Sequence, residues 1–296
     1  MLNKVIKGKI QSPHFVLIYG TDSVGKSTFG ASAPNPIFLE MESGSDNLDV
    51  SRLKIKSFEE LNQALNSLLT EEHDFKSVVV DSLDWLEPLV WAAVCQEGGQ
   101  KSIEDFGYGK GYVLALKKWN DLILTFKKLR EVKKMNIVLI AHSQIKVFND
   151  PSQPQSYDRY QLKLNDKAAA LFREAVDSVL FATFETFVKK DGNMSKAKAF
   201  GEGKRVLFTE RRPSFDAKNR FGLPFELPLS WDAYVSAKND SKPDNLKMIR
   251  QDIEDLIATC EKLDKKELMQ KAYIQAGDNI EKLNEVLNRI KVTLTK

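Results

Sequence analysis

Apolar residues along the chain fall into short uninterrupted runs that alternate with segments of helical periodicity. The runs are HFVLIY, PIFLEME, FKSVVVD, MNIVLIAHS and DSVLFATFE. Short aliphatic and β-branched runs between helical segments are typical of strands that are buried on both faces of a sheet. The pattern therefore predicts an α/β fold with a mostly parallel central sheet covered by helices.

Two of the intervening segments repeat apolar residues at the three- and four-residue steps of an amphipathic helix. The first opens with the capping pair Ser57 and Glu60, which is typical of a helix N-terminus. The second extends from about Tyr112 to Lys133 and places its lysines opposite its apolar stripe. Both stripes are interpreted as core-facing, with the lysines in solvent.

The pattern changes after Asp177. DSVLFATFETFV, the turn KKDGNM and KRVLFTERRP predict a hairpin, which would extend the sheet with antiparallel strands. From about Asp240 the chain is highly charged, with amphipathic helical stripes in which acids and bases nearly balance. We therefore expect a core over residues 1–238 and a helical C-terminal appendage over residues 239–296.

Composition narrows the class of protein. The 296 residues are 42% hydrophobic and 29% charged, with a formal net charge of +3, so any nucleic-acid surface must be a local patch. The N-terminus lacks an apolar segment and no run approaches membrane-spanning length, so we expect a cytoplasmic protein without a membrane partner. Cys95 and Cys260 fit no disulfide or zinc pattern.

The segment between the first apolar run and the next helix fits the phosphate-binding pattern G-x-x-x-x-G-K-[ST]. Glycines let the backbone wrap closely around an anion, and successive N–H groups point at phosphate oxygens. Lys26 is expected to reach the outer phosphates and Ser27 to ligate Mg²⁺. The sequence thus predicts an ATP and Mg²⁺ site formed by Gly20, Thr21, Asp22, Ser23, Val24, Gly25, Lys26, Ser27 and Thr28. The alternative is a glycine turn with an incidental lysine.

Acidic residues at the ends of two further strands complete the predicted site. Asp81 ends the run SVVVD, where a carboxylate can hold Mg²⁺ directly or through water, as in a Walker B element. Glu42 ends the strand that follows the phosphate loop, at the sheet edge where ligand sites of α/β proteins collect. We expect Glu42 to activate the attacking water, with Glu40 as the alternative. The alternative for each is an ordinary strand-end acid.

His142 follows another buried strand, again at the carboxyl edge of the sheet. A polar residue at this point can hydrogen-bond the terminal phosphate and report its loss to the loop that follows. We therefore include His142 among the catalytic candidates, against the alternative of a structural histidine.

With these elements in this order, the chain resembles the RecA-like core shared by bacterial recombinases and DnaB-type helicases. FLEME is similar to the segment that carries the recombinase glutamate, and AHS occupies the place of the polar sensor. FGYGKGY, VLIAHS and DAKNRFGLP together look like phage-encoded ATP-binding proteins, including the Sak-four type of single-strand annealing protein. The resemblance covers roughly residues 10 to 235.

The resemblance implies a role for Lys218 and Arg220 and an oligomeric state. In RecA-like rings and filaments a similar lysine and arginine reach the neighbouring subunit's terminal phosphate, so these two residues are expected to act in trans. The alternative is a solvated basic turn. The first strand begins near the N-terminus, so we expect little room for a separate polymerisation segment, which disfavours strand exchange and processive unwinding.

Two basic, aromatic segments follow the Asp81 strand and the His142 strand, where RecA-like proteins present loops to DNA. Cations neutralise phosphates and aromatic rings stack on unpaired bases, so these segments are predicted to bind single-stranded DNA. The candidates are Lys101, Tyr108, Lys110, Lys146, Phe148, Tyr157 and Arg159, with Lys189, Lys190, Lys196 and Lys198 of the hairpin turn as a further phosphate-tracking surface. The alternative is a pair of ordinary surface loops.

The sequence as a whole predicts an oligomeric ATPase that binds single-stranded DNA and promotes annealing or recombination in phage DNA metabolism, within the host cytoplasm. A single-strand DNA-binding protein is a further candidate partner. One alternative is a helicase-like or loader ATPase of replication. The other is a nucleotide-dependent switch or small-molecule kinase that does not bind nucleic acid.

Overall fold

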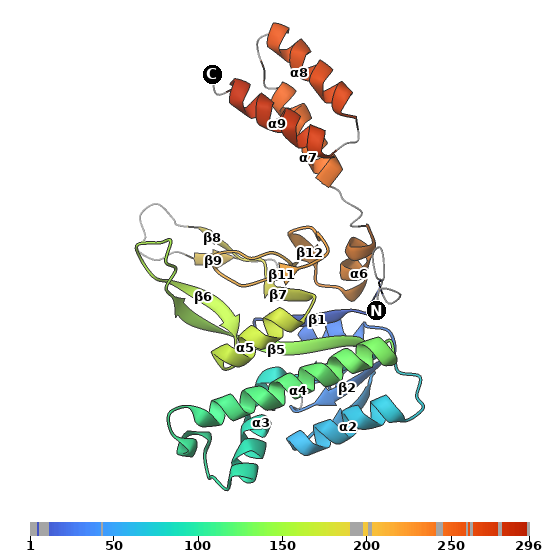
Figure 1. The fold of residues 1–296 in the computed structure, drawn as a ribbon, viewed down its shortest axis with the longest axis vertical. Helices are drawn as coiled ribbons and strands as arrows, with labels where there is room; N and C mark the ends of the chain where they lie inside the picture. The colour runs from blue at the N-terminus through green and yellow to red at the C-terminus, as the bar shows by residue number, and fades with distance from the viewer. Residues whose placement is uncertain are drawn as a thin grey trace. The chain divides into compact units, whose positions relative to one another are not determined.

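The computed structural model describes residues 5, 12–42, 44–189, 198–200, 203–240, 245–258, 260, 263–277 and 280–294. Its main sheet has the order β12-β10-β7-β1-β5-β4-β2-β3, with β6 on β5 and β11 on β7 (Figure 1). Strands β1, β2, β3, β4, β5 and β7 pair in parallel, while β6, β10, β11 and β12 join antiparallel. The predicted architecture is confirmed: an α/β core with a mostly parallel central sheet and an antiparallel extension, followed by C-terminal helices.

The strands alternate with helices through the parallel part of the sheet. The strands are β1 (Phe15–Gly20), β2 (Pro36–Glu40), β3 (Ser51–Lys54), β4 (Ser77–Asp81), β5 (Asn136–Phe148), β6 (Tyr157–Leu162), β7 (Ser178–Phe184), β8 (Phe187–Lys189), β9 (Lys198–Phe200), β10 (Arg205–Phe208), β11 (Lys218–Asn219) and β12 (Glu226–Pro228). The helices are α1 (Lys26–Ala31), α2 (Phe58–Thr70), α3 (Leu83–Gly98), the 3-10 helix η2 (Ile103–Phe106), α4 (Lys110–Val132), α5 (Asp166–Ala175), α6 (Trp231–Asp240), α7 (Asn245–Ala258), α8 (Leu263–Ala276) and α9 (Ile280–Leu294).

Strand β1 shows why the sheet is buried on both faces. Its side chains alternate between two separate cores, because successive residues of a strand point to opposite faces. Phe15, Leu17 and Tyr19 join the larger core beneath α2, α3, α4 and α5, whereas Val16 and Ile18 join the smaller core with α1 and α6. The phosphate loop begins at the carboxyl end of this strand, so the loop is anchored to a buried, well-packed element.

The two predicted amphipathic helices are α2 and α4. At the start of α2, Ser57 Oγ accepts from the Glu60 N–H, while the Glu60 carboxylate accepts from the Lys56 N–H instead of completing the box at Ser57. Helix α3 was not predicted, because its apolar residues are spread around the helix and Pro88 lies inside it. The edge strand β3 was not predicted either, because its residues are mostly exposed.

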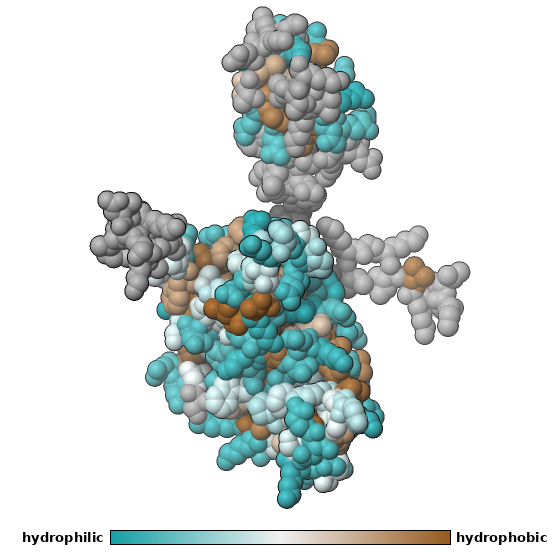
Figure 2. Space-filling view, turned by 90° about the vertical axis from the view of Figure 1, so that its left-hand side faces the viewer, coloured by the Kyte–Doolittle hydropathy of each residue, from teal (hydrophilic) through white to brown (hydrophobic). Residues whose placement is uncertain are grey.

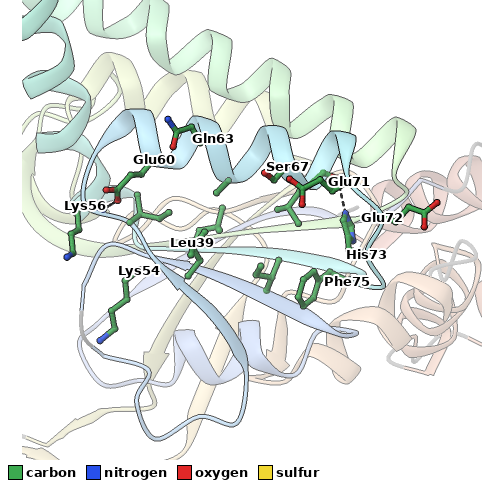
Figure 3. A pocket seen from close by; sticks show the side chains of 15 residues that line it. Leu39, Lys54, Lys56, Glu60, Gln63, Ser67, Glu71, Glu72, His73 and Phe75 are labelled. Carbon is green, nitrogen blue, oxygen red and sulfur yellow. Dashed lines mark hydrogen bonds between the residues drawn. The ribbon is translucent and has the colours of Figure 1, made fainter.

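A groove of about 590 Å³ opens between α2 and the outer strands β2 and β3. Figure 3 shows Glu60 and Glu71 along the helix, with Lys54 and Leu39 on the strand side. None of the predicted site residues lines this groove. It lies at the sheet edge, several strands from the phosphate loop.

The structure divides into one compact unit over residues 1–237 and a second over residues 238–296. The second unit contains α7, α8 and α9 and has its own small core, which includes Ile253, Ile257, Leu283 and Ile290. Over the described ranges, no helix combines the length and the apolar character needed to cross a membrane.

Candidate nucleotide-binding site

Two glycines of the phosphate loop are required by the backbone. A Cβ on Gly20 would lie 1.9 Å from the Ala182 carbonyl oxygen, because β7 runs directly beside β1 at this point. Gly25 is the N-cap of α1 and has φ 107°, a conformation that side-chain-bearing residues rarely adopt. The loop can therefore turn sharply from β1 into α1 and direct its N–H groups inward.

The Lys26 side chain is buried and folds back over the loop. Its ammonium group donates to the carbonyl oxygens of Gly20, at 3.2 Å, and Thr21, at 2.9 Å. Burial lowers the pKa of Lys26, and the nearby carboxylates of Asp22 and Asp81 partly offset this. The cation is thus held at the mouth of the loop, where a phosphate group could take over its hydrogen bonds.

Ser27 and Asp81 are in direct contact. The Ser27 hydroxyl donates to Asp81 Oδ2 at 2.7 Å. Asp81 is 5% exposed, and burial raises its pKa while the Ser27 hydrogen bond lowers it. A hydroxyl and a carboxylate oxygen are ligands that suit Mg²⁺.

Ser27 and Asp81 would supply two oxygen ligands, and a magnesium ion held by them would complete its coordination with phosphate and water. Throughout the described ranges, no three His, Cys, Asp or Glu side chains are grouped so that they could hold a metal ion. The Thr21 hydroxyl of the loop is buried without a hydrogen-bond partner in the described structure. Such an orphaned hydroxyl is costly unless a ligand satisfies it.

Glu42 and Glu40 have different surroundings, although they are two residues apart. Glu42 lies just beyond β2, and its Oε1 accepts from the Ser82 hydroxyl at 3.2 Å. Burial raises the pKa of Glu42, with the charge of His142 acting in the opposite direction. Glu40 is 3% exposed, accepts from the Ser45 hydroxyl and lies 3.6 Å from Arg52 Nε. Glu40 therefore connects β2 to β3, whereas Glu42 faces the start of α3.

His142 is held by an acid that the sequence analysis did not single out. Asp84, on the first turn of α3, accepts from the His142 N–H and from its Nδ1, both at 2.9 Å. This hydrogen bond raises the pKa of His142. The pKa of Asp84 is lowered by its hydrogen bonds from His142, which outweigh its burial. The sequence signal for Asp84 was an acid in a first helical turn, but its partner is 58 residues away.

Lys218 and Arg220 lie toward the amino-terminal ends of the parallel strands, whereas their own phosphate loop lies at the carboxyl ends. Lys218 pairs with Val179 near the start of β7, whereas the loop follows Gly20, which pairs with Ala182. The Lys218 ammonium donates to the Arg173 carbonyl, and Arg220 donates to the Glu174 carbonyl at 3.0 Å. Both cations therefore sit at the C-terminus of α5, in a position that does not serve the site of the same subunit.

The first predicted DNA segment is exposed. Lys101 and Lys110 are exposed, and Tyr108 is fully exposed between Gly107 and Gly109. All three residues of Gly107–Tyr108–Gly109 have positive φ, so the tyrosine projects from a tight turn directly before α4. In Figure 1 the start of α4 and strand β6 both lie on the left-hand side of the core.

The second predicted DNA segment is not a loop but mostly a hairpin of β5 and β6. The Lys146 ammonium donates a hydrogen bond to Asp166 Oδ1 at 2.8 Å. The half-buried rings of Phe148 and Tyr157 contact each other edge to face. The predicted DNA role of Arg159 is wrong. Its side chain is 4% exposed, donates to Asp216 and to the Phe215 carbonyl at 3.1 Å, and covers the Phe148 ring.

The hairpin instead exposes two apolar side chains that the sequence analysis missed, Ile145 and Val147, which are 61% and 65% exposed. Figure 2 faces this side of the molecule and shows a largely hydrophilic surface broken by apolar patches. Of the predicted phosphate-tracking lysines, Lys190 and Lys196 lie outside the described residues. For Lys189 and Lys198 the structure describes only the backbone, in β8 and β9.

Comparison with known proteins gives a family match and a distant structural similarity. The family described as AAA domain matches residues 12–221. A solved structure titled as the crystal structure of the RadB recombinase aligns with 13% identity and a TM-score of 0.42, over 75% of this chain and 90% of that chain. No curated protein matches the chain.

Proposed function

The chain belongs to the AAA domain family, and we propose that it binds and hydrolyses ATP in the site between β1, β2, β4 and β5. The observation that carries the proposal is the hydrogen bond from Ser27 to Asp81, at 2.7 Å. It brings together the two ligands expected for Mg²⁺ beside a phosphate loop with a buried lysine. Ser27 and Asp81 are 54 residues apart in sequence, so the fold brings them into contact.

Each side chain has a distinct role in the proposed reaction. Lys26 exchanges its loop carbonyls for the outer phosphate oxygens and holds them in place. Mg²⁺, when bound by Ser27 and Asp81, neutralises charge on the phosphates. Glu42 takes a proton from the attacking water, and burial, which raises the pKa of its carboxyl group, makes the carboxylate a stronger base. His142, positioned by Asp84, donates to the terminal phosphate.

We propose further that residues 1–238 act as the ATPase core of a homo-oligomer and residues 239–296 as an appendage. Because Lys218 and Arg220 lie at the other end of the sheet from their own loop, a site in the neighbouring subunit is the one they can complete. Carbonyl groups at the end of α5 orient both cations, and Arg220 NH1 also lies 3.5 Å from Asp177 Oδ1, so a phosphate in the neighbouring site would compete with this carboxylate for Arg220.

The proposed nucleic-acid partner is single-stranded DNA, bound during annealing or recombination. Support comes from the exposed Tyr108 between Lys101 and Lys110, which pairs a stacking ring with phosphate-neutralising cations. Lys146 of the hairpin is available in part, with a side chain that is 37% exposed. A change in the hairpin on DNA binding can reach His142, because β5 continues from this residue into the hairpin.

The test is ATP turnover in Mg²⁺ with and without single-stranded DNA, combined with a mass measurement of the assembly. The proposal expects turnover that DNA stimulates and an assembly larger than one chain. Turnover that is unaffected by DNA would favour the nucleotide-dependent switch. Transfer of phosphate to a small acceptor would favour the kinase, and directional unwinding of a duplex would favour the helicase-like alternative.

A further inference from the structure

Arg205 lies against the phosphate loop on the side away from Asp81. The loop follows β1, which has β5 and β4 on one side and β7 and β10 on the other. On β10, Arg205 stands directly opposite Phe184 of β7. Its guanidinium carbon is 5.9 Å from the centre of the Phe184 ring, and its NH1 is 3.0 Å from the point that a Cβ on Gly25 would occupy.

The Arg205 guanidinium is not used by a carboxylate. Among the described residues it forms no ion pair or hydrogen bond, and it lies between the phosphate loop and the Phe184 ring. The adjacent Lys204, in contrast, lies 3.4 Å from Glu185 and 3.5 Å from Glu226. Arg205 is therefore an exposed planar cation, oriented by an aromatic ring and placed at the edge of the loop.

The chemistry on the two sides of the loop is different. Lys26, Asp81, Glu42 and His142 gather toward β4 and β5, which assigns that side to the outer phosphates and the metal. A nucleotide whose outer phosphates occupy that side must leave the loop with its sugar and base elsewhere. The side formed by β7 and β10 offers Arg205 and Phe184, and a guanidinium plane stacks well on a planar base.

We propose that Arg205 and Phe184 form the nucleoside-binding subsite, with the base stacked on the Arg205 guanidinium and Phe184 supporting the guanidinium from beneath. The inference rests on the proposed function, because it assigns the second half of the same nucleotide site. It makes Arg205 a determinant of the preference for a nucleotide over bare polyphosphate, and not a phosphate ligand.

The experiment compares the affinity for ATP with the affinity for inorganic tripolyphosphate, both measured by calorimetry in Mg²⁺. Tripolyphosphate carries the phosphate chain without sugar or base. Arg205→Ala should weaken ATP binding about tenfold, the scale of one stacking contact, and leave tripolyphosphate binding unchanged. Phe184→Leu should cause a smaller loss in the same direction. Lys204→Ala, next to Arg205 but facing the opposite side of the strand, is the matched control and should change neither affinity.

The variants also separate this inference from the proposed function. Equal losses of ATP and tripolyphosphate in Arg205→Ala would make Arg205 a phosphate ligand and overturn the subsite, as would unchanged affinity for both. Arg205→Lys keeps the charge but not the plane, and should repeat the selective loss of ATP if Arg205→Ala does not fold. Failure of the proposed function would instead appear in the unaltered protein, as binding of neither compound.

Discussion

The Ser27 hydroxyl donates to Asp81 Oδ2 at 2.7 Å, which joins the first turn of α1 to the end of β4. Ser27→Ala should therefore lose a metal ligand and weaken ATP binding about tenfold in Mg²⁺, with little change when the metal is chelated. Ser27→Thr retains the hydroxyl and is the matched control. Affinities measured with and without Mg²⁺ check the prediction, and a Thr variant as weak as the Ala variant would contradict it.

The two neighbouring glutamates should respond differently to the same substitution. Glu42→Gln should bind ATP normally but hydrolyse it about 10² to 10⁴ times more slowly, because the amide cannot accept the proton. Glu40→Gln should lower the melting temperature through its lost contact with Arg52 and leave the chemistry largely intact. Single-turnover hydrolysis and thermal unfolding of both variants check this. Full turnover by Glu42→Gln would assign the base elsewhere.

Lys218 and Arg220 are predicted to act across a subunit boundary. Arg220→Ala alone should reduce turnover by about a thousandfold, the scale of an arginine finger. Lys26→Ala alone should lose ATP binding. Mixing the two variants should restore part of the activity, because an intact loop can then meet an intact Arg220 at a mixed interface. Normal turnover by Arg220→Ala alone would rule out the trans role.

Stacking and charge should contribute to the affinity for single-stranded DNA in ways that two substitutions can distinguish. Tyr108→Ala should weaken single-strand binding at every salt concentration, by roughly 1 to 3 kcal/mol for a lost stacking ring. Lys110→Ala should reduce the slope of affinity against salt by about one unit, because one phosphate contact is removed. Fluorescence anisotropy with a labelled oligonucleotide measures both effects.

Lys128→Ala, an exposed position near the far end of α4, is the control for the DNA prediction and should leave the salt slope unchanged. Arg159→Ala should act through stability, because it removes the buried contacts of the guanidinium with Asp216, the Phe215 carbonyl and the Phe148 ring. Absence of binding at low salt, with or without ATP, would contradict the DNA role and favour the switch.

Glu87 should make stability depend on pH. It is buried on α3 and accepts from the Asn165 N–H at 2.9 Å, which fixes the start of α5. Burial raises its pKa from 4.5 to about 7. The folded chain thus keeps a proton that the unfolded chain has lost, so the free energy of unfolding should fall as pH rises from about 4.5 to about 7.

Glu87→Gln removes this titration and should flatten the pH dependence over the same interval. Urea unfolding of both proteins at several pH values measures the difference between their slopes. Parallel slopes would show that Glu87 has an ordinary pKa in the folded protein.

The sequence by itself determined the parallel sheet and the phosphate loop, because both depend on local patterns. Buried strands require continuous apolar runs, as in β1, β4 and the first half of β5. The loop requires glycine where φ is positive or another backbone approaches, as at Gly25 and Gly20. Such requirements are written within a few consecutive residues, so no long-range information was needed to find them.

Only the tertiary structure decided which polar groups act together. Glu40 and Glu42 look equivalent in sequence. In the structure, the pairing of β2 with β3 places Glu40 beside Arg52, whereas Glu42 accepts a hydrogen bond from Ser82. Arg159 was predicted to bind DNA, but the fold places Asp216, 57 residues later in the sequence, in contact with its guanidinium. Asp84 and Arg205 acquired their neighbours through strand order alone, by the adjacency of β4 to β5 and of β10 to β7. A charged side chain takes its role from the partners that desolvate or neutralise it, and those partners come from distant segments that no local pattern records.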